Sequence, residues 1–459
     1  MAKKLWGARF RKKTDPLVEE FTSSISYDKR LALYDIKGSI AHAKMLGKCN
    51  IITRKESSLL VSGLRFLEKR IEKIKIDPNS EDIHTAVTNL LRKQVGSVAD
   101  KLHTARSRND QVVLDVKMYC KDAIDILVSL ITSLQKVVIR FADRNSRIII
   151  PAYTHLQVAQ CVLLSHHLLA YVEMFQRDKQ RLLDAKERTD FMPLGSGALS
   201  GTGLGINREY IKKELGFARI TDNSIDAVSD RDFIIELLSC LAIASVHLSR
   251  IAEDLIIWST REFNFINIDF SFCTGSSIMP HKKNPDVLEL IRASVGKVHG
   301  DLSSVLILLK GLPLSYNRDL QLDKPPLFNG VETVSDILQI FIELFKNIKL
   351  NKKVIIKRIE DESLFSVDVV EYLIEKGLSY RQAHDITGRL VKDTLDKGRR
   401  ISDLSIKELK KYSDKFDSRI KSILNAWVSV SRKTSYGGTN PGLVKRQINK
   451  WNKRLYARL

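Results

Sequence analysis

The sequence lacks any run of about 20 consecutive apolar residues, the length that a helix needs to cross a bilayer. Its first residues are basic and are not followed by the apolar stretch of a secretory signal. The five cysteines among the 459 residues lie far apart, with no CxxC pair and no Cys/His group at zinc spacing. These absences predict a cytoplasmic protein with reduced thiols, no membrane partner and no zinc site.

Two further absences narrow the chemistry. No two histidines have the spacing of a metal site on a helix, and the adjacent His166 and His167 point in different directions. The glycine-rich stretch 195–201 has no Walker lysine and follows a charged helical stretch rather than a strand. We therefore expect a tight turn between long helices there, not a phosphate-binding loop.

The net charge of +21 is high, but no segment concentrates it. A basic protein can attract nucleic acid or acidic substrates, or it can simply have a lysine-rich solvated surface. The basic residues are spread along the whole chain, without a basic tail or a basic stripe carrying aromatic residues. We favour the surface interpretation and predict no nucleic-acid partner.

Long helices are the strongest pattern in the sequence. No glycine or proline occurs between Ser97 and Ile150, and apolar residues recur there in alternating steps of three and four. The same period returns in four later runs, so that the five runs cover residues 116–141, 164–182, 234–258, 288–309 and 331–345. Five amphipathic helices in succession predict an all-α bundle. Such long apolar stripes also favour packing against further copies of the chain.

Shorter helical patterns flank this bundle. We expect three parts: an N-terminal helical domain at 1–106, a central long-helix bundle at 107–358 that carries the oligomer contacts and the active-site loop, and a C-terminal helical domain at 359–459.

Four polar segments interrupt the helical pattern, at 82–85, 102–111, 153–157 and 274–285. In the last, Asn284 and Pro285 are typical of a helix start, which favours anions, and Lys282 and Lys283 add positive charge. In the second, Arg106 and Arg108 offer planar forks that grip carboxylates. Each segment alone also fits an ordinary loop, a helix cap or a structural histidine.

Taken together, the segments resemble the fumarase/aspartase superfamily. The loop 275–285, Gly-Ser-Ser-Ile-Met-Pro-His-Lys-Lys-Asn-Pro, is similar to the superfamily signature, and Arg106-Ser107-Arg108-Asn109-Asp110-Gln111 resembles the argininosuccinate lyase branch. Similar stretches lie at 5–7, 82–85, 153–157, 194–199, 226–233, 316–321 and 437–439. The resemblance implies an all-α, fumarase/aspartase-like fold with a long central bundle, and elimination of fumarate from argininosuccinate without a metal or cofactor.

The resemblance also implies roles for single residues. Ser276 is expected to be the base that removes the Cβ proton, Lys282 to stabilise the aci-carboxylate, and His155, held by Glu289, to be the acid or the orienting group. The substrate is expected to contact Ser24, His84, Arg106, Arg108, Asn109, Thr154, Asn284, Tyr316, Gln321 and Lys324. Members are homotetramers in which each site draws segments from three subunits.

Some positions depart from the family pattern. His281 stands where glutamine is usual, which adds a titratable group to the loop, and Ala105 stands where glycine is usual. Ser200 replaces an alanine, and Ser366-Val367-Asp368 replaces Ala-Thr-Asp. The proposed catalytic residues are all present.

Three other interpretations stay open on sequence grounds. A sister enzyme, such as adenylosuccinate lyase or fumarase, would share the fold, but the paired arginines argue against it. A non-enzymatic protein like the related lens crystallins is disfavoured by the intact Ser276, His155 and Lys282. Nucleic-acid binding would require strongly salt-dependent affinity and has no supporting motif.

Overall fold

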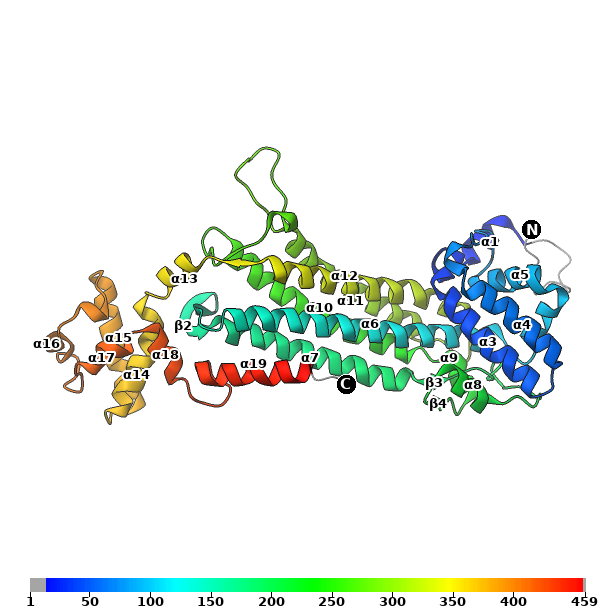
Figure 1. The fold of residues 1–459 in the computed structure, drawn as a ribbon. Coiled ribbons are helices and arrows are strands. Elements are labelled where there is room, and N and C mark those ends of the chain that lie inside the picture. The colour runs from blue at the N-terminus through cyan, green and yellow to red at the C-terminus, as the bar shows by residue number, and fades with distance from the viewer. Residues whose placement is uncertain (1–13, 457–459) are drawn as a thin grey trace. The chain divides into compact units, whose positions relative to one another are not determined.

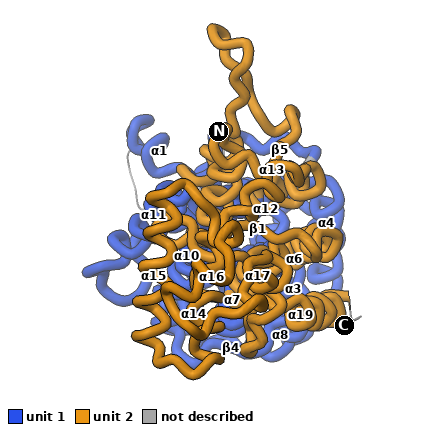
Figure 2. The backbone as a smooth tube through the Cα atoms, turned by 90° about the vertical axis from the view of Figure 1, so that its left-hand side faces the viewer, with its two compact units in different colours: residues 1–129, 178–245, 294–335 blue, residues 130–177, 246–293, 336–459 orange. Residues whose placement is uncertain are grey.

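The computed structural model describes residues 14–456 of the chain, so the stretch 5–7 lies outside the described residues. The backbone is mostly helical (Figure 1). It divides into two compact units, coloured separately in Figure 2. Unit 1 comprises residues 1–129, 178–245 and 294–335, and unit 2 comprises residues 130–177, 246–293 and 336–459.

All five predicted long helices are present. They are α6 (Arg108–Arg144), α7 (Leu164–Thr189), α10 (Asp232–Ser259), α11 (Asp286–Leu309) and α12 (Lys324–Asn347). Several periodic apolar residues of α6 are fully buried, among them Val116, Leu127 and Leu134. The apolar period in the sequence therefore marks the packed face of the helix, as expected for a bundle.

The shorter elements of unit 1 come from the N-terminal part of the chain and from the segments 178–245 and 294–335. They are α1 (Pro16–Thr22), α2 (Ile25–Asp28), η1 (Lys29–Leu31), α3 (Ala32–Lys48), α4 (Arg54–Glu68), η2 (Ile71–Lys73), α5 (Ile83–Val95), η3 (Gly96–His103), α8 (Arg208–Leu215), α9 (Ser224–Ser229) and η5 (Arg318–Asp323). Helices α3 and α4 approach so closely that a Cβ on Gly47 would lie 2.5 Å from the Cβ of Ser57. Glycine is therefore required at that crossing.

The shorter helices of unit 2 follow the bundle in sequence. They are α13 (Lys352–Arg358), η6 (Glu362–Phe365), α14 (Ser366–Glu375), α15 (Tyr380–Asp396), η7 (Ile401–Asp403), α16 (Ile406–Leu409), α17 (Arg419–Ile423), α18 (Ala426–Arg432) and α19 (Pro441–Tyr456). Buried residues between Val369 and Ile423 form a core of their own, in which Tyr372 and Phe416 stack. The three-part domain division stays a prediction.

Short strands accompany the helices. An antiparallel hairpin joins β1 (Ile149–Thr154) to β2 (Gln157–Leu163), and the two-residue strands β3 (Phe191–Met192) and β4 (Arg219–Ile220) pair in parallel. In unit 2, β5 (Ile266–Asn267) pairs with β6 (Lys349–Leu350), and η4 (Phe270–Phe272) follows β5. The sequence analysis did not anticipate these strands, because runs as short as 149–154 carry too few residues to separate a strand from a helix end.

Helix α10 is the one described helix with the length and apolar composition to cross a membrane. Its most apolar window has a mean hydropathy of 1.7, and 56% of that window is buried inside the protein. Buried residues such as Ile234, Leu237 and Leu241 pack within the fold. This composition is what a central core helix requires, and by itself it is weak support for a membrane span.

A buried ion pair fixes the start of α10 in unit 1. Arg231, which is 1% exposed, donates to the carboxylate of Asp323, which is fully buried at the end of η5. Lys324 contacts the other oxygen of the same carboxylate at 2.8 Å. Removing the carboxylate would leave two buried cations without their counter-ion.

Replacing Asp323 by alanine should therefore lower the free energy of unfolding by about 3–5 kcal/mol, the cost of breaking a buried pair. Denaturant unfolding at fixed protein concentration measures this. The matched control is Glu332→Ala, which breaks the Arg30–Glu332 pair at 3.1 Å between side chains that are 45% and 58% exposed. An exposed pair contributes about 0–1 kcal/mol. Equal losses in the two variants would contradict the assignment.

Candidate active site

The predicted site residues belong to both compact units. Unit 1 contains Ser24, His84, Arg106, Arg108, Asn109, Tyr316, Gln321 and Lys324, and unit 2 contains Thr154, His155, Ser276, Lys282, Asn284 and Glu289. The predicted residues of each unit are therefore described separately.

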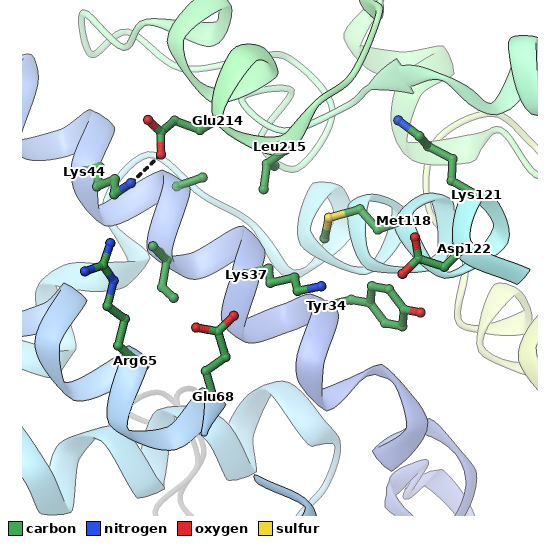
Figure 3. A pocket seen from close by; sticks show the side chains of 12 residues that line it. Tyr34, Lys37, Lys44, Arg65, Glu68, Met118, Lys121, Asp122, Glu214 and Leu215 are labelled. Atoms are coloured by element: carbon green, nitrogen blue, oxygen red, sulfur yellow. Dashed lines mark hydrogen bonds and ion pairs between the residues drawn. The ribbon is translucent and has the colours of Figure 1, made fainter. Parts of the chain in front are cut away.

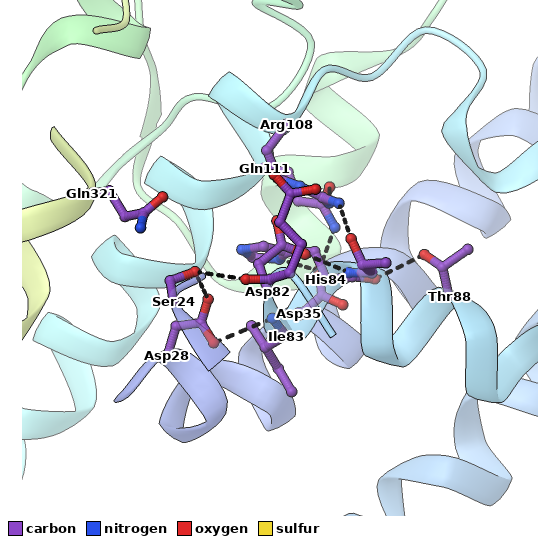
Figure 4. A network of polar contacts seen from close by, with 12 residues as sticks. Ser24, Asp28, Asp35, Asp82, Ile83, His84, Thr88, Arg108, Gln111 and Gln321 are labelled. Carbon is purple, nitrogen blue, oxygen red and sulfur yellow. Dashed lines mark hydrogen bonds and ion pairs between the residues drawn. The ribbon is translucent and has the colours of Figure 1, made fainter. Parts of the chain in front are cut away.

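Arg108 has a polar partner in unit 1 at each of its three side-chain nitrogens (Figure 4). Its Nε lies 2.9 Å from Oδ2 of Asp82, its Nη1 donates to Gln111 at 2.8 Å, and its Nη2 donates to Thr85 at 3.2 Å. The side chain remains 27% exposed. These contacts use three of the five N–H groups, and a guanidinium with two N–H groups left can bind a carboxylate.

Arg106 is more enclosed than Arg108. Its Nη1 donates to Ser39 Oγ at 2.9 Å, while Nε and Nη2 are buried and have no hydrogen-bond partner among the described residues. Burial lowers the pKa of this guanidinium. The preceding Ala105 has φ of 58°, the left-handed conformation that glycine adopts without strain. The left-handed backbone at this position explains why glycine is usual there in the family.

The glycine-rich stretch forms a turn that is tied to the start of α6. The buried Asp110 carboxylate accepts from the backbone N–H of Gly195 at 2.9 Å, of Gly197 at 2.8 Å and of Ser107 at 3.0 Å. Gly197 has φ of 62°, and a Cβ there would lie 2.6 Å from a backbone oxygen. Asn109 reaches the same turn by donating to the carbonyl of Ala198 at 2.9 Å.

Ser24 lies at the start of α2 and is 4% exposed. Its hydroxyl donates to Asp28 Oδ2 at 2.6 Å, and Asp28 Oδ1 accepts from the backbone N–H of Ile83 at 3.2 Å. Burial raises the pKa of Asp28. The serine is thus linked to the first turn of α5, where the Asp82–Thr85 segment contacts Arg108 (Figure 4).

His84 lies in a buried ion cluster beneath Arg108. Its Nδ1 is 3.0 Å from Asp35 Oδ1 and 3.2 Å from Asp115 Oδ2, and all three side chains are at most 1% exposed. Burial and the Arg108 charge act to lower the pKa of His84, yet hydrogen bonds to Asp115 and Asp35 raise it to about 10. The ring is therefore an imidazolium at neutral pH.

The two carboxyls of the cluster behave differently. Burial alone would raise the pKa of Asp35, but the hydrogen bond and charge of His84 lower it. Burial together with the Asp35 charge raises the pKa of Asp115. Asp35 is thus the carboxylate that carries the pair with the imidazolium.

These three groups are also the described set whose ligand atoms lie within 4.8 Å of one another, as a metal site requires. A metal ligand must be a neutral imidazole, whereas His84 is held in its protonated form. The positive charges of Arg106 and Arg108 also act on Asp35. The donor set fits an internal ion cluster better than a divalent cation.

Three further predicted residues follow α11 in the chain. Gln321 donates to the carbonyl of Thr22 at 3.1 Å, which links η5 to the end of α1. Lys324 is 3% exposed and contacts Asp323, and Tyr316 is half-buried. The residue before it, Ser315, has φ of 72°, so the backbone bends sharply there.

In unit 2, Thr154 and His155 lie exposed at the tip of the β1–β2 hairpin. Thr154 pairs with Gln157, and the two residues between them, His155 and Leu156, have φ of 55° and 57°. A two-residue hairpin turn of type I′ has this conformation, and glycine or asparagine usually occupies it. Strained positions of this kind concentrate at functional sites.

The loop between η4 and α11 contains the serine. A backbone pair between Thr274 and Asn284 closes its base, with N–H to O distances of 3.1 and 2.9 Å. Above this pair the loop extends away from the helices (Figure 1). Ser276 Oγ accepts from the backbone N–H of Met279 at 3.0 Å and of Ile278 at 3.3 Å. Two such donors stabilise negative charge on the serine oxygen.

The two loop lysines differ in their contacts. Lys283 donates to Asn267 at 2.8 Å and to the Ile268 carbonyl, and lies 4.2 Å from the centre of the Phe270 ring. Lys282 is exposed, and its ammonium has no ion-pair or hydrogen-bond partner among the described residues, although its backbone N–H donates to the carbonyl of Met279 at 3.0 Å. The lysine predicted to meet the substrate is thus the free one. Glu289, also exposed, lies in the first turn of α11.

The sequence analysis did not identify Asp35, Gln111 and Asp115 as part of the site. A signal existed for the first: the polar residues Asp35, Ser39 and His42 recur at helical spacing on the buried face of α3. A stripe of polar residues on a buried face requires partners. Asp115 gives no comparable signal.

A surface hollow of 340 Å³ in unit 1 contains none of the predicted residues (Figure 3). Its lining mixes four basic side chains, Lys37, Lys44, Arg65 and Lys121, with three acidic ones, Glu68, Asp122 and Glu214. Lys44 and Glu214 pair with each other at 2.5 Å. The hollow therefore carries no strong excess of one charge.

The raised pKa of His84 makes stability depend on pH. A folded-state pKa of about 10, above the ordinary value, gives a contribution that is complete below about pH 6.5 and is lost as the pH rises to about 10. Over this interval the free energy of unfolding should fall as the pH rises, because the folded protein keeps this proton and the unfolded chain releases it. His84→Gln should remove that slope, measured by denaturant unfolding at fixed protein concentration. Parallel curves for the two proteins would contradict the imidazolium assignment.

Comparison with known proteins adds an independent finding. The family described as "Lyase" matches residues 8–300, and the family described as "Argininosuccinate lyase C-terminal" matches residues 364–431. The argininosuccinate lyase of Desulforudis audaxviator is 46% identical over 454 residues, which is 98% of this chain and 99% of that protein. That of Pelotomaculum thermopropionicum is 47% identical over 457 residues, covering 99% of both chains.

Among solved structures, an EDDS lyase in complex with formate superposes with a TM-score of 0.84 at 26% identity, covering 97% of this chain and 91% of that one. A fumarate lyase from Mesorhizobium, 16% identical with a TM-score of 0.75 over 96% of this chain and 99% of that one, shares the fold. With relatives of this identity along almost the entire length, the chain belongs to the argininosuccinate lyase family of the fumarase/aspartase superfamily.

Proposed function

We propose that this chain cleaves argininosuccinate reversibly into arginine and fumarate, as a step of arginine biosynthesis in the cytoplasm. The observation that carries the proposal is its 46–47% identity to argininosuccinate lyases over nearly the full length of both chains. The catalytic residues implied by the family pattern are all present. The mechanism below follows from the contacts of each residue.

Ser276 is the proposed general base. A serine hydroxyl is a weak base in water and needs its alkoxide stabilised. The N–H groups of Ile278 and Met279, which donate to its oxygen, supply that stabilisation from within the loop. The alkoxide takes the Cβ proton, and the electron pair left on carbon moves into the adjacent carboxylate.

The resulting aci-carboxylate carries two negative charges. Lys282 is the proposed counter-charge, because its ammonium is not committed to any described residue. Such electrostatic stabilisation of the developing charge is often the largest contribution to catalysis. When the electron pair returns, the Cβ–Cα double bond of fumarate forms and the bond to the guanidino nitrogen breaks. The nitrogen keeps the electron pair of that bond, and arginine departs as the neutral guanidine or, with a donated proton, as the guanidinium.

Arg108 is the proposed clamp for a substrate carboxylate, since its side chain is 27% exposed and its contacts with Asp82, Thr85 and Gln111 use only three of its five N–H groups. Asn109 and Ser24 are proposed to bind beside it, with Asn284, Tyr316, Gln321, Lys324 and Thr154 as further contacts. His155 is proposed as the partner acid or orienting group, assisted by Glu289. The reaction is an elimination and requires no redox group, which agrees with the expectation of no cofactor.

We also propose that the active enzyme is a homotetramer with sites shared by three subunits. Helix α11 exposes large apolar side chains: Leu290 is 68% exposed, Leu306 46% and Ile307 71%. The hairpin tip exposes Leu156 at 70%, and the catalytic loop exposes Ile278 at 85%. Apolar surface of this extent marks protein contacts, and it accompanies the very segments that hold His155 and Ser276.

The role of Ser276 can be tested by turnover. Ser276→Ala should lower kcat by roughly a hundredfold to ten-thousandfold, the typical contribution of a general base. The assay follows fumarate by its ultraviolet absorbance with argininosuccinate as substrate. Ser277→Ala, one residue along the same exposed loop, is the matched control and should change kcat little. Near-normal turnover in Ser276→Ala would remove this serine from the mechanism.

Adenylosuccinate and malate serve as parallel substrates in the same assay. Fumarate from argininosuccinate alone is the expected result. Fumarate from adenylosuccinate or malate instead would assign a sister reaction. No fumarate from any of the three, in a folded oligomer, would favour a structural role for the protein.

The assembly can be tested through α11. Ile307→Asp places a charge on the exposed apolar surface and should shift the sedimentation mass from the tetramer toward smaller species, with turnover falling in parallel. The control is Leu395→Asp, a change at a residue of α15 that is 67% exposed. It should leave mass and turnover unchanged. A tetrameric, fully active Ile307→Asp enzyme would contradict the proposed interface.

A further inference from the structure

A continuous chain of polar contacts leads from the buried cluster to the exposed fork of Arg108. His84 Nδ1 lies 3.0 Å from Asp35, and the same Asp35 oxygen accepts from the side-chain amide N–H of Gln111. The carbonyl oxygen of Gln111 in turn accepts from Arg108 Nη1 at 2.8 Å. Figure 4 draws these groups close together, with Arg108 labelled at the top of the network.

Gln111 can serve both neighbours in only one orientation. A carboxamide has a donor side and an acceptor side, and an ionised carboxylate only accepts. The negative Asp35 therefore selects the NH₂ group of Gln111, and this turns the amide oxygen toward Arg108. Gln111 is 2% exposed, so water does not compete for either side.

The charge on Asp35 depends in turn on its surroundings. A buried carboxylate is strongly disfavoured unless a counter-charge compensates it. His84 from α5 provides that charge, while Asp115 from α6 faces the other side of the same ring nitrogen. Arg106 and Arg108 also act on Asp35, and His103 lies near the same charges. All these groups belong to unit 1.

We propose that Gln111 is a positioning residue of the lyase reaction, oriented by the Asp35–His84–Asp115 cluster so that it fixes the Arg108 guanidinium for a substrate carboxylate. The inference rests on the proposed function, in which Arg108 is the carboxylate clamp. In this proposal His84 does not contact the substrate, because it is 1% exposed and lies against two aspartate side chains. It acts on the substrate only through the position of Arg108.

The geometry explains why three partners are needed. Asp82 engages Nε, Thr85 engages Nη2 and Gln111 engages Nη1 of the same planar group. One contact at each of the three nitrogens fixes the plane of the guanidinium and leaves two of its five N–H groups without a described partner. Without Gln111 the group can rotate about the two remaining contacts, and bidentate binding requires a fixed plane.

A double-mutant cycle on kcat/KM for argininosuccinate tests the proposal. Gln111→Met keeps the shape of the side chain and removes both hydrogen bonds. It should raise KM roughly ten- to a hundredfold, the effect of losing one hydrogen bond to a charged group. In the Arg108→Ala background the same change should alter kcat/KM by no more than about twofold. Equal factors in the two backgrounds would overturn the proposal.

Thr88→Val is the matched control within the buried region. Thr88 is 4% exposed and bonds the carbonyl of His84 at 2.9 Å and the ring of His103 at 3.2 Å, but contacts neither Gln111 nor Arg108. Its KM should equal that of the unmodified enzyme. A KM increase as large as that of Gln111→Met would mean a general disturbance of unit 1 and would overturn the positioning role.

If Gln111→Met does not fold by circular dichroism, Gln111→Asn replaces it in the cycle. The shorter amide keeps the chemistry but cannot reach Asp35 and Arg108 together, so KM should still rise in the parent and not in Arg108→Ala. An unchanged KM would overturn the proposal. An unmodified enzyme without turnover on argininosuccinate would instead overturn the proposed function, so the two failures are distinguishable.

Discussion

A histidine buried in contact with two aspartate side chains is the constraint around which unit 1 is arranged. Burying any of these charges alone would be strongly unfavourable, so the cluster exists only if α3, α5 and α6 bring Asp35, His84 and Asp115 together. The same requirement fixes the first turns of α5 and α6. Asp82 and Thr85 lie at the start of α5 and Arg108 begins α6, so the helices that form the cluster also position Arg108, the proposed carboxylate clamp.

Three non-glycine residues with a left-handed backbone lie next to proposed substrate contacts. Ala105, His155 and Ser315 adopt the left-handed conformation although none is a glycine. Each lies within a residue or two of a proposed substrate contact, namely Arg106, Thr154 and Tyr316. Glycine is present where a side chain would also collide. The backbone N–H groups of Gly195 and Gly197 donate to Asp110, and a Cβ on either glycine would collide with its neighbours. Strain at the first group persists because the surrounding contacts determine the backbone there.

The sequence carries much of this architecture and only part of the site. The apolar period of α6, α7, α10, α11 and α12 is long enough to predict all five helices, because burial of one stripe repeats over many turns. The β1–β2 hairpin escapes prediction since its turn residues, His155 and Leu156, are not the usual Asn-Gly pair. The motif predicts that Arg108 and Ser276 matter. It does not reveal that Asp35, 76 residues before Gln111, accepts a hydrogen bond from that amide, because such a pairing depends on the tertiary packing of the helices.

The backbone pair between Thr274 and Asn284 has a consequence for the loop that it closes. Because hydrogen bonds join the two ends, residues 275–283 form a loop that is closed at its base. The entropy cost of bringing the two ends together is part of folding. Doubling the length of the loop would raise this loop-closure free energy by only about 0.6 kcal/mol. Capture of a substrate then has to order only the interior of the loop. Insertions or deletions between 275 and 283 would thus change how far the serine reaches far more than how firmly the loop is anchored.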